Sequence, residues 1–245
     1  VLQNNYAEAG IVPEDDPRLG VELATYEVDG TTMSGYLARL QAGEKRPAVV
    51  VIHENRGLNP HIKDVTRRVA LEGFLAFAPD ALAPVGGTPA DEDQAREMIS
   101  GLDAEATAKR LAAAVPFLAA HPLSTGKVGA VGFCWGGGMV NELAAAGVGL
   151  TAAVPYYGRQ LAAERVPEIA APLCLHYAGI DERINAGIDA YVAALKAAGK
   201  SFELHMYEGA NHAFNNDTNA ARYDKEAAEL AWGRTVAFFR KHLSG

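Results

Sequence analysis

Cys134 stands at the centre of a glycine-rich segment that has the composition of a nucleophile elbow. The segment Gly132-Phe-Cys-Trp-Gly136 follows the apolar, β-prone residues 128–133 and leads into the helix-forming residues 139–146. Glycines two positions before and two after the central residue let a strand and a helix approach closely, while the central side chain is exposed at a strained turn. The more familiar central residue is serine, so this sequence predicts chemistry by a thiol nucleophile.

Asp181 and His212 follow Cys134 in the order nucleophile, acid, histidine. Ligands of a doubly wound sheet lie beyond the carboxyl ends of its strands, so we considered the side chains directly after each expected strand. Asp181 comes shortly after the apolar residues 173–177, and His212 comes shortly after residues 202–207. This chain order is typical of the α/β-hydrolase fold and differs from that of other folds that host a triad.

A cysteine, a histidine and an aspartate in this order can cleave an acyl bond. Cys134 would be activated by His212 and by the positive end of the helix that follows the turn. Asp181 would hold the imidazole in the reactive tautomer and stabilise its protonated form. We expect the backbone N–H groups of Trp135 and Asn55 to form the oxyanion hole for the tetrahedral intermediate.

Each of these residues also has a structural interpretation. Cys134 could be a small buried hydrophobic residue, Asp181 a helix N-cap, and His212 a surface histidine. Asp80 follows an expected strand and competes for the place of the acid. His53 is a rival for the base by position, although it precedes the nucleophile in the chain.

Three further polar or reactive side chains lie inside expected strands. His176, His205 and Cys174 are therefore expected at core or sheet-facing positions. Cys134 stands at a turn and Cys174 in a strand, so we expect two free cysteines rather than a disulfide, which suits a reducing compartment. No group of cysteines and histidines has zinc-like spacing, and we expect neither a metal nor a cofactor.

Two other classes of function compete for the glycine-rich turn. A dinucleotide site is disfavoured because the glycines do not run G-x-G-x-x-G and no acidic residue follows the next strand, residues 150–156, to hold a ribose. A thiol-based redox sensor or binding module would use an exposed cysteine of low pKa at position 134. The presence of Asp181 and His212 in triad order argues against the sensor.

Alternating strand and helix segments surround these residues. We expect strands at residues 21–28, 32–40, 47–53, 74–78, 128–133, 150–156, 173–177 and 202–207. We expect helices at residues 62–72, from about 91, and at 103–120, 139–146, 187–198 and 223–243. The first two strands form an antiparallel hairpin across Asp29-Gly30, and the remaining order implies a mostly parallel sheet with helices on both faces.

Length and charge limit the classes of protein. The 245 residues suit a single α/β-hydrolase domain over residues 1–245, with residues 1–19 as an N-terminal arm. A net charge of -8 argues against a nucleic-acid partner, and no apolar segment is long enough to cross a membrane. The numbering begins at Val1 rather than at a methionine. The location is therefore open: cytoplasmic by default, exported or periplasmic if a leader was removed.

Five segments together resemble the dienelactone hydrolase family, which comprises cysteine-dependent α/β-hydrolases. They are His53-Glu-Asn-Arg-Gly-Leu-Asn-Pro60, Gly132-Phe-Cys-Trp-Gly-Gly-Gly138, Pro155-Tyr-Tyr-Gly158, Asp181-Glu-Arg-Ile-Asn185 and Gly209-Ala-Asn-His-Ala-Phe-Asn-Asn-Asp217. The resemblance extends over residues 21–243 and implies a Cys134–His212–Asp181 triad that cleaves a small ester or lactone through an acyl-thioester. It also implies that Glu54 takes the place of a glutamate that contacts the resting thiol until substrate binding shifts it.

One segment departs from the family pattern. Members that act on chlorocatechol breakdown products hold the substrate carboxylate with arginines, one of them shortly after the catalytic histidine. Here residues 214–217 contain no arginine, and the charge of Asp217 would disfavour an anion. Arg56 and Arg159 are the candidate replacements, with Tyr157 as a further substrate-binding residue. We expect a small-molecule substrate and a monomer or homodimer, and the set of segments is also similar to uncharacterised relatives with export-like leaders.

Overall fold

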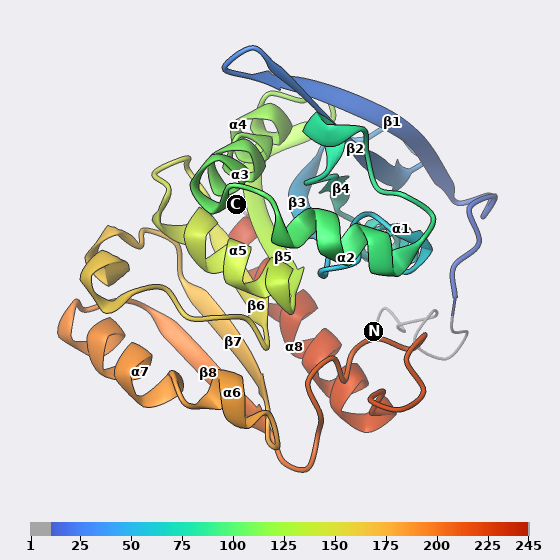
Figure 1. The fold of residues 1–245 in the computed structure, drawn as a ribbon. Helices are drawn as coiled ribbons and strands as arrows, with labels where there is room; N and C mark the ends of the chain where they lie inside the picture. The colour runs from blue at the N-terminus through green and yellow to red at the C-terminus, as the bar shows by residue number, and fades with distance from the viewer. Residues whose placement is uncertain (1–10, 245) are drawn as a thin grey trace.

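Eight strands form one sheet in the computed structural model, which describes residues 11–244 (Figure 1). The strands are β1 (Leu19–Val28), β2 (Thr31–Leu40), β3 (Arg46–Ile52), β4 (Leu75–Pro79), β5 (Ser124–Phe133), β6 (Ala152–Tyr156), β7 (Leu173–Ala178) and β8 (Phe202–Tyr207). Their order in the sheet is β1-β2-β4-β3-β5-β6-β7-β8. The pairs from β4 to β8 are parallel, whereas β2 is antiparallel to both β1 and β4, so the predicted fold class is confirmed.

The β1–β2 hairpin turns where the sequence indicates. Val28 pairs with Thr31, and the two residues between them, Asp29 and Gly30, have φ angles of 49° and 76°. Two-residue hairpin loops favour positive φ at both central positions because this backbone twist matches the twist of the strands. The predicted hairpin is confirmed.

Helices cover both faces of the sheet (Figure 1). They are α1 (Pro60–Leu71), α2 (Glu92–Ser100), α3 (Ala104–Ala112), α4 (Ala114–Ala119), α5 (Trp135–Ala145), α6 (Glu182–Asn185), α7 (Ile188–Ala197) and α8 (Lys225–Leu243). Two short 3-10 helices span Ala83–Val85 and Ala163–Glu168. Buried side chains of α1 and α8 share one core, and those of α3, α4, α5 and α7 share the core on the opposite face. None of the helices within residues 11–244 is long and apolar enough to cross a membrane.

The prediction of one continuous helix over residues 103–120 is wrong. The segment forms two helices, α3 and α4, which meet at Ala113. Proline has no N–H to donate, and its ring clashes with the carbonyl four residues earlier. Pro116 therefore interrupts the hydrogen bonds at Ala112, and a second helix begins at Ala114.

The described part of the expected N-terminal arm packs on α1, and residues 1–10 of the arm lie outside the described residues. The Val12 N–H donates to Asp64 Oδ1 at 2.7 Å, and Arg67 Nε donates to the Val12 carbonyl at 2.8 Å. These contacts join residues before β1 to the helix that follows the β3 loop.

Candidate active site

The turn between β5 and α5 has the geometry of the predicted elbow. Cys134 has φ of 57° and ψ of −118°, a strained conformation for a residue that carries a Cβ atom. A side chain at Gly132 would clash with the carbonyl of Gly136, and a side chain at Gly136 would clash with the carbonyls of Ile52 and His53. The two glycines therefore allow α5 to begin directly against β3 and β5, with the thiol at the carboxyl edge of the sheet.

Two loops at the carboxyl ends of β7 and β8 bond to each other. The Gly179 N–H donates to the Tyr207 carbonyl at 2.8 Å, and the Ile180 N–H donates to the Ala210 carbonyl at 3.1 Å. A Cβ atom at Gly179 would come within 2.7 Å of the Tyr207 carbonyl oxygen, so this approach needs glycine. These two hydrogen bonds place Asp181, the residue after Ile180, beside the loop that carries His212.

Cys134, His212 and Asp181 form a continuous hydrogen-bonded chain. His212 Nε2 lies 3.0 Å from Cys134 Sγ, and His212 Nδ1 lies 2.5 Å from Asp181 Oδ2. An ionised carboxylate only accepts, so Nδ1 carries the proton, and Nε2 accepts from the thiol. Asp181 Oδ1 also accepts from the Ile184 N–H at 3.4 Å, so the aspartate caps α6 as well as holding the imidazole.

His53, the rival for the base, has both ring nitrogens engaged in the loop. Its Nε2 accepts from the Ala81 N–H at 3.1 Å, and Nδ1 donates to the Glu54 carbonyl at 2.6 Å. The ring is fully buried and stacks on Trp135 with centroids 5.3 Å apart. Burial lowers the pKa of His53, so its ring remains neutral. Its two hydrogen bonds hold the start of the loop that carries Glu54.

Asp80, the rival for the acid, anchors the loop after β3 instead. Its carboxylate accepts from the Thr88 N–H and hydroxyl, each at 2.8 Å. The Thr88 hydroxyl in turn accepts from the Leu58 N–H at 2.9 Å, and Gly57, at φ of 77°, leaves room for the threonine. The loop that carries Asn55 is thereby tied to the end of β4.

The resting thiol is protonated at neutral pH. Burial raises the pKa of Cys134 to about 11, and the negative charges of Glu54 and Asp181 add to the rise. A hydrogen bond from the Trp135 N–H and the positive charge of Arg183 oppose it. This site therefore holds a protonated thiol rather than a standing thiolate.

Glu54 is held by Asn216, a residue to which the sequence gave no role. Asn216 Nδ2 lies 3.3 Å from Glu54 Oε2 and 3.4 Å from Oε1. Asn216 Oδ1 accepts from both the N–H and the hydroxyl of Thr218, at 3.0 and 2.6 Å, which turns the amide N–H groups toward Glu54. Burial raises the pKa of Glu54, although the charges of His61 and His212 and the Asn216 hydrogen bond lower it.

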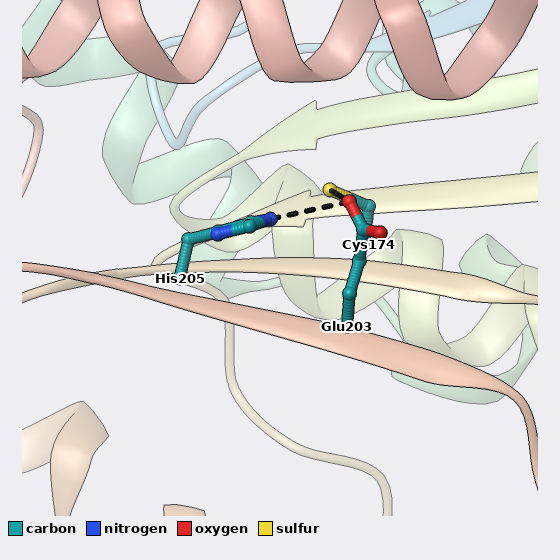
Figure 2. Close-up of side chains that lie close together, drawn as sticks. All are labelled: Cys174, Glu203 and His205. Atoms are coloured by element: carbon teal, nitrogen blue, oxygen red, sulfur yellow. Dashed lines mark hydrogen bonds and ion pairs between the residues drawn. The ribbon is translucent and has the colours of Figure 1, made fainter.

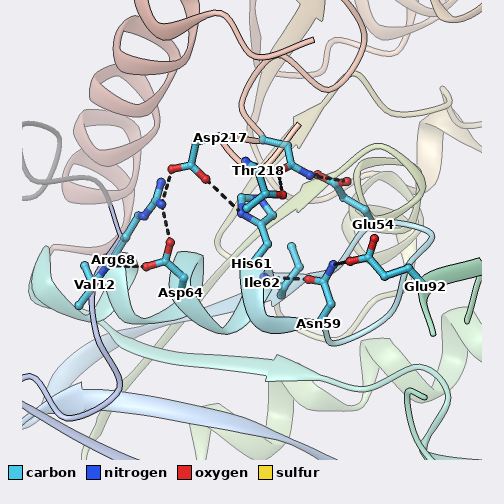
Figure 3. Close-up of polar contacts among 11 residues, drawn as sticks. Val12, Glu54, Asn59, His61, Ile62, Asp64, Arg68, Glu92, Asp217 and Thr218 are labelled. Atoms are coloured by element: carbon cyan, nitrogen blue, oxygen red, sulfur yellow. Dashed lines mark hydrogen bonds and ion pairs between the residues drawn. The ribbon is translucent and has the colours of Figure 1, made fainter. Parts of the chain in front are cut away.

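The loop that carries Asn216 and Asp217 is fixed to α1 by a partly buried ion pair (Figure 3). Asp217 Oδ2 accepts from Arg68 Nη2 at 2.5 Å, and Asp217 Oδ1 lies 3.4 Å from His61 Nδ1. Arg68 also pairs with Asp64. Burial opposes the ionisation of Asp217, but hydrogen bonds and charges from His61 and Arg68 hold its pKa at about 2. The charge of Asp217 that we expected to repel an anion is thus compensated by Arg68.

Tyr157 lies behind the imidazole rather than at the surface. Its side chain is fully buried, and its ring centroid lies 5.0 Å from that of His212 and 5.1 Å from that of Phe214. The backbone has φ of 36°, and the hydroxyl lacks a hydrogen-bond partner of good geometry among the described residues. Tyr157 thus packs against the ring that must be held in place.

The two arginines expected to hold a carboxylate differ in their contacts. Arg56 Nη1 lies 3.2 Å from Asp93 Oδ1 and 3.9 Å from Glu92 Oε2, so its charge is paired with the first turn of α2. Arg159 is exposed just after β6. The cation whose charge acts most on the thiol is a third one, Arg183 of α6, and its position two residues after Asp181 was the available sequence signal.

Comparison with known proteins agrees with this geometry. The dienelactone hydrolase family matches residues 33–243, which is most of the chain. The chain belongs to the dienelactone hydrolase family. It is 32% identical over 254 residues to a protein of Saccharolobus solfataricus assigned as a carboxymethylenebutenolidase, covering 88% of this chain and 96% of the relative. A protein of Escherichia coli strain K12 with the same assignment is 32% identical over 248 residues, covering 95% and 91%.

Solved structures of dienelactone hydrolase-like proteins share the fold of this hydrolase. One assigned as a dienelactone hydrolase from Klebsiella pneumoniae superposes with a TM-score of 0.80 at 28% identity, covering 91% of this chain and 99% of that chain. A dienelactone hydrolase-like promiscuous phosphotriesterase from metagenomic libraries gives a TM-score of 0.81 at 26% identity, covering 93% and 100%. The chain is thus a hydrolase with an α/β-hydrolase fold.

Proposed function

We propose that this hydrolase cleaves small esters or lactones with Cys134 as its nucleophile and His212 and Asp181 as the base and its orienting acid. The observation that carries the proposal is the Cys134–His212–Asp181 hydrogen-bonded chain, with separations of 3.0 and 2.5 Å, at a strained turn. The raised pKa of the thiol makes proton transfer to His212 part of the reaction rather than a preceding equilibrium.

In the acylation step, His212 Nε2 takes the thiol proton as Cys134 Sγ attacks the substrate carbonyl carbon. The carbonyl oxygen becomes an oxyanion, which the N–H groups of Trp135 and Asn55 stabilise. The carbon–oxygen bond to the leaving alkoxide then breaks, and the imidazolium gives its proton to that oxygen. Asp181 stabilises the imidazolium throughout and keeps its own charge.

Water completes the turnover. His212 removes a proton from a water molecule, whose oxygen attacks the thioester carbon and forms a second oxyanion in the same hole. The carbon–sulfur bond breaks, the acid product leaves, and the thiolate recovers its proton from His212. With a lactone as substrate, the alcohol and the acid are parts of one ring-opened product.

The raised pKa of Cys134 also argues against the redox-sensor alternative. Sensor cysteines react as thiolates and are therefore exposed and of low pKa. Here burial and the charge of Glu54 favour the protonated thiol. A thiol of this kind is expected to react slowly with peroxide.

Trapping the acyl-enzyme tests the proposed function. An aryl ester mixed with the full chain and quenched in acid is expected to add one acyl group to the peptide that contains Cys134, measured by mass spectrometry. The Cys134→Ala variant should give no adduct. Turnover of esters and lactones with no acylated cysteine under burst conditions would contradict the proposal.

Glu54 is proposed to restrain the thiol in the resting enzyme. Replacing Glu54 with glutamine removes a negative charge near Cys134, so we expect the pKa of the thiol to fall. A decrease of one pKa unit would make alkylation by iodoacetamide at neutral pH about tenfold faster. The rate constant against pH, followed at the Cys134 peptide, measures this change.

Glu97→Gln is the matched control for that experiment, because it removes one negative charge from an exposed position of α2. The control should alkylate at the wild-type rate. An unchanged pH profile in Glu54→Gln would remove the proposed gating role. Asn216→Ala should also shift the profile, since it releases the Glu54 carboxylate from its amide partner.

Arg159 and Arg56 are still candidates for holding a substrate carboxylate, and the charge of Arg183 near the thiol makes it a third. We expect Arg183→Gln to raise KM for an ester with a free carboxylate about two- to fivefold, the effect of an exposed ion pair worth up to about 1 kcal/mol. KM for a neutral ester of the same size should stay unchanged. If Arg159→Gln gives the selective increase and Arg183→Gln does not, the carboxylate lies beside β6 instead.

A further inference from the structure

Reactive side chains gather on β7 and β8, on the face of the sheet that α8 covers. Cys174 pairs in register with Glu203, and His176 pairs with His205. Residues two apart on a strand point to the same face, so the four side chains form two neighbouring cross-strand pairs. Figure 2 shows Cys174, Glu203 and His205 turned toward one another.

The atoms of three of these side chains already have nearly the spacing of metal ligands. Glu203 Oε1 lies 3.3 Å from Cys174 Sγ and 3.1 Å from His205 Nε2. One sulfur, one nitrogen and one oxygen atom of the three residues all lie within 4.8 Å of one another. In a tetrahedral zinc site with the usual bond lengths, neighbouring ligand atoms are about 3.3–3.7 Å apart. Small side-chain shifts therefore bring the three atoms onto one ion.

The ligands lead from solvent to a buried thiol. Cys174 is fully buried, whereas the side chains of His205 and Glu203 are 23% and 46% exposed. β8 is an edge strand, so a hydrated cation can reach the carboxylate and the imidazole from outside the sheet. A set of one thiolate, one imidazole and one carboxylate selects zinc-like transition metals over magnesium or calcium.

The surrounding charges allow a dication. The positive charge of Arg234 lies near Cys174, and that of Lys241 lies near Glu203. These two charges oppose the binding of a metal cation. One thiolate and one carboxylate neutralise a divalent ion, so the loaded cluster has no net charge. His176 stays outside this set because its Nδ1 bonds the Tyr207 hydroxyl at 2.8 Å and its Nε2 bonds the Thr235 hydroxyl at 3.1 Å.

The structure assigns to Cys174, Glu203 and His205 a binding site for a divalent transition-metal ion of the zinc class. The ion bonds Cys174 Sγ, His205 Nε2 and a carboxylate oxygen of Glu203, with water as the fourth ligand. Without metal, the Cys174 thiol donates a hydrogen bond to Glu203 Oε1. When the ion binds, this thiol proton is released to solvent, and the neutral His205 ring carries its proton on Nδ1. The site staples the edge strand to β7 and is separate from Cys134.

Another group, His61, Asp64 and Asp217, has comparable spacing among the described residues. Both of its carboxylates are already paired with Arg68, so a metal would displace an existing cation. It also lacks a sulfur ligand. A thiolate signal therefore distinguishes the Cys174 site from this group.

Cobalt(II) is the probe, because thiolate coordination gives a charge-transfer band in the near ultraviolet. The titration uses the full chain, stripped with a chelator and kept reduced, in the Cys134→Ala background, which leaves Cys174 as its one thiol. We expect a band that saturates at one cobalt per chain and disappears when zinc is added. Zinc should also raise the melting temperature, because it binds the folded state.

Three substitutions of proposed ligands and one matched control, all in the same background, decide the assignment. Cys174→Ser should abolish the band, and Glu203→Gln should weaken cobalt binding at least about tenfold, as loss of a ligand or of its orientation does. Glu208→Gln, an exposed glutamate just past β8, is the matched control and should bind as before. His205→Ala, at a half-buried position, should also weaken cobalt binding. It tests the assignment even if Cys174→Ser, at a buried position, fails to fold.

Either of two results overturns the assignment. The first is that no thiolate band appears in the Cys134→Ala protein. The second is that a band appears but keeps its affinity in both Glu203→Gln and His205→Ala. Affinity should increase with pH, because binding releases the thiol proton.

Discussion

Cys134→Ala is expected to lower kcat/KM for an aryl ester by about 10⁴-fold or more, which is the usual consequence of removing a triad nucleophile. Without sulfur, no acyl-thioester can form, and the oxyanion hole and substrate binding leave a small residual rate. KM should change little, because the methyl group of alanine leaves the binding surface open. Initial rates over a substrate series measure both parameters.

The thermal unfolding midpoint and circular dichroism of the alanine variant are the control, since the turn at Cys134 is strained in either protein. Wild-type-like unfolding is required before the loss of rate is attributed to the nucleophile. Cys134→Ser adds a contrast: its hydroxyl can bond His212 but is a weaker nucleophile, so its activity should lie far below wild type. A folded alanine variant with wild-type ester turnover would exclude Cys134 as the nucleophile.

Asp181→Asn is expected to lower kcat by about 10²–10⁴-fold at neutral pH. The asparagine amide would present N–H groups to His212 Nδ1, which carries the proton in the wild type. The ring then favours the tautomer with the proton on Nε2, and this nitrogen can no longer accept from Cys134. KM should change little, because Asp181 acts through His212 rather than on the substrate.

Glu182→Gln is the matched control for Asp181→Asn, because it removes an exposed carboxylate from the adjacent position of α6. It should retain wild-type kcat. The asparagine keeps an oxygen that can accept from the Ile184 N–H, so the cap of α6 survives and stability should be nearly unchanged. If Asp80→Asn lowers kcat and Asp181→Asn does not, the acid of the triad is assigned to the wrong strand.

Local backbone requirements made the elbow predictable from sequence. Gly132 and Gly136 are needed because neighbouring carbonyls occupy the space of a Cβ atom, and that need is written in the residue types. The alternation of apolar strands with helical segments likewise predicted where along the chain each strand of the sheet lies, to within a few residues. The break at Ala113 was predictable from Pro116, which the helical periodicity of residues 103–120 concealed.

Contacts across the sheet were not predictable in the same way. Asn216 lies in a segment whose spacing gives no indication that its side chain bonds Glu54. Asp80 and His53 looked like alternatives to Asp181 and His212 until their hydrogen bonds to the β3 and β4 loops were known. The His53–Ala81 and Glu54–Asn216 pairs join residues 28 and 162 positions apart, and only the folding of the chain brings them together.

The sequence by itself determined the glycine-rich turn that carries Cys134 and the chain order of Cys134, Asp181 and His212. These features depend on residue type and on neighbours along the chain. Only the tertiary structure decided that the thiol of Cys134 is protonated, because burial and the charge of Glu54 set its pKa. It also decided that Cys174, Glu203 and His205 form a cluster, although linear spacing showed no metal site, because parallel pairing of β7 and β8 brings distant residues side by side.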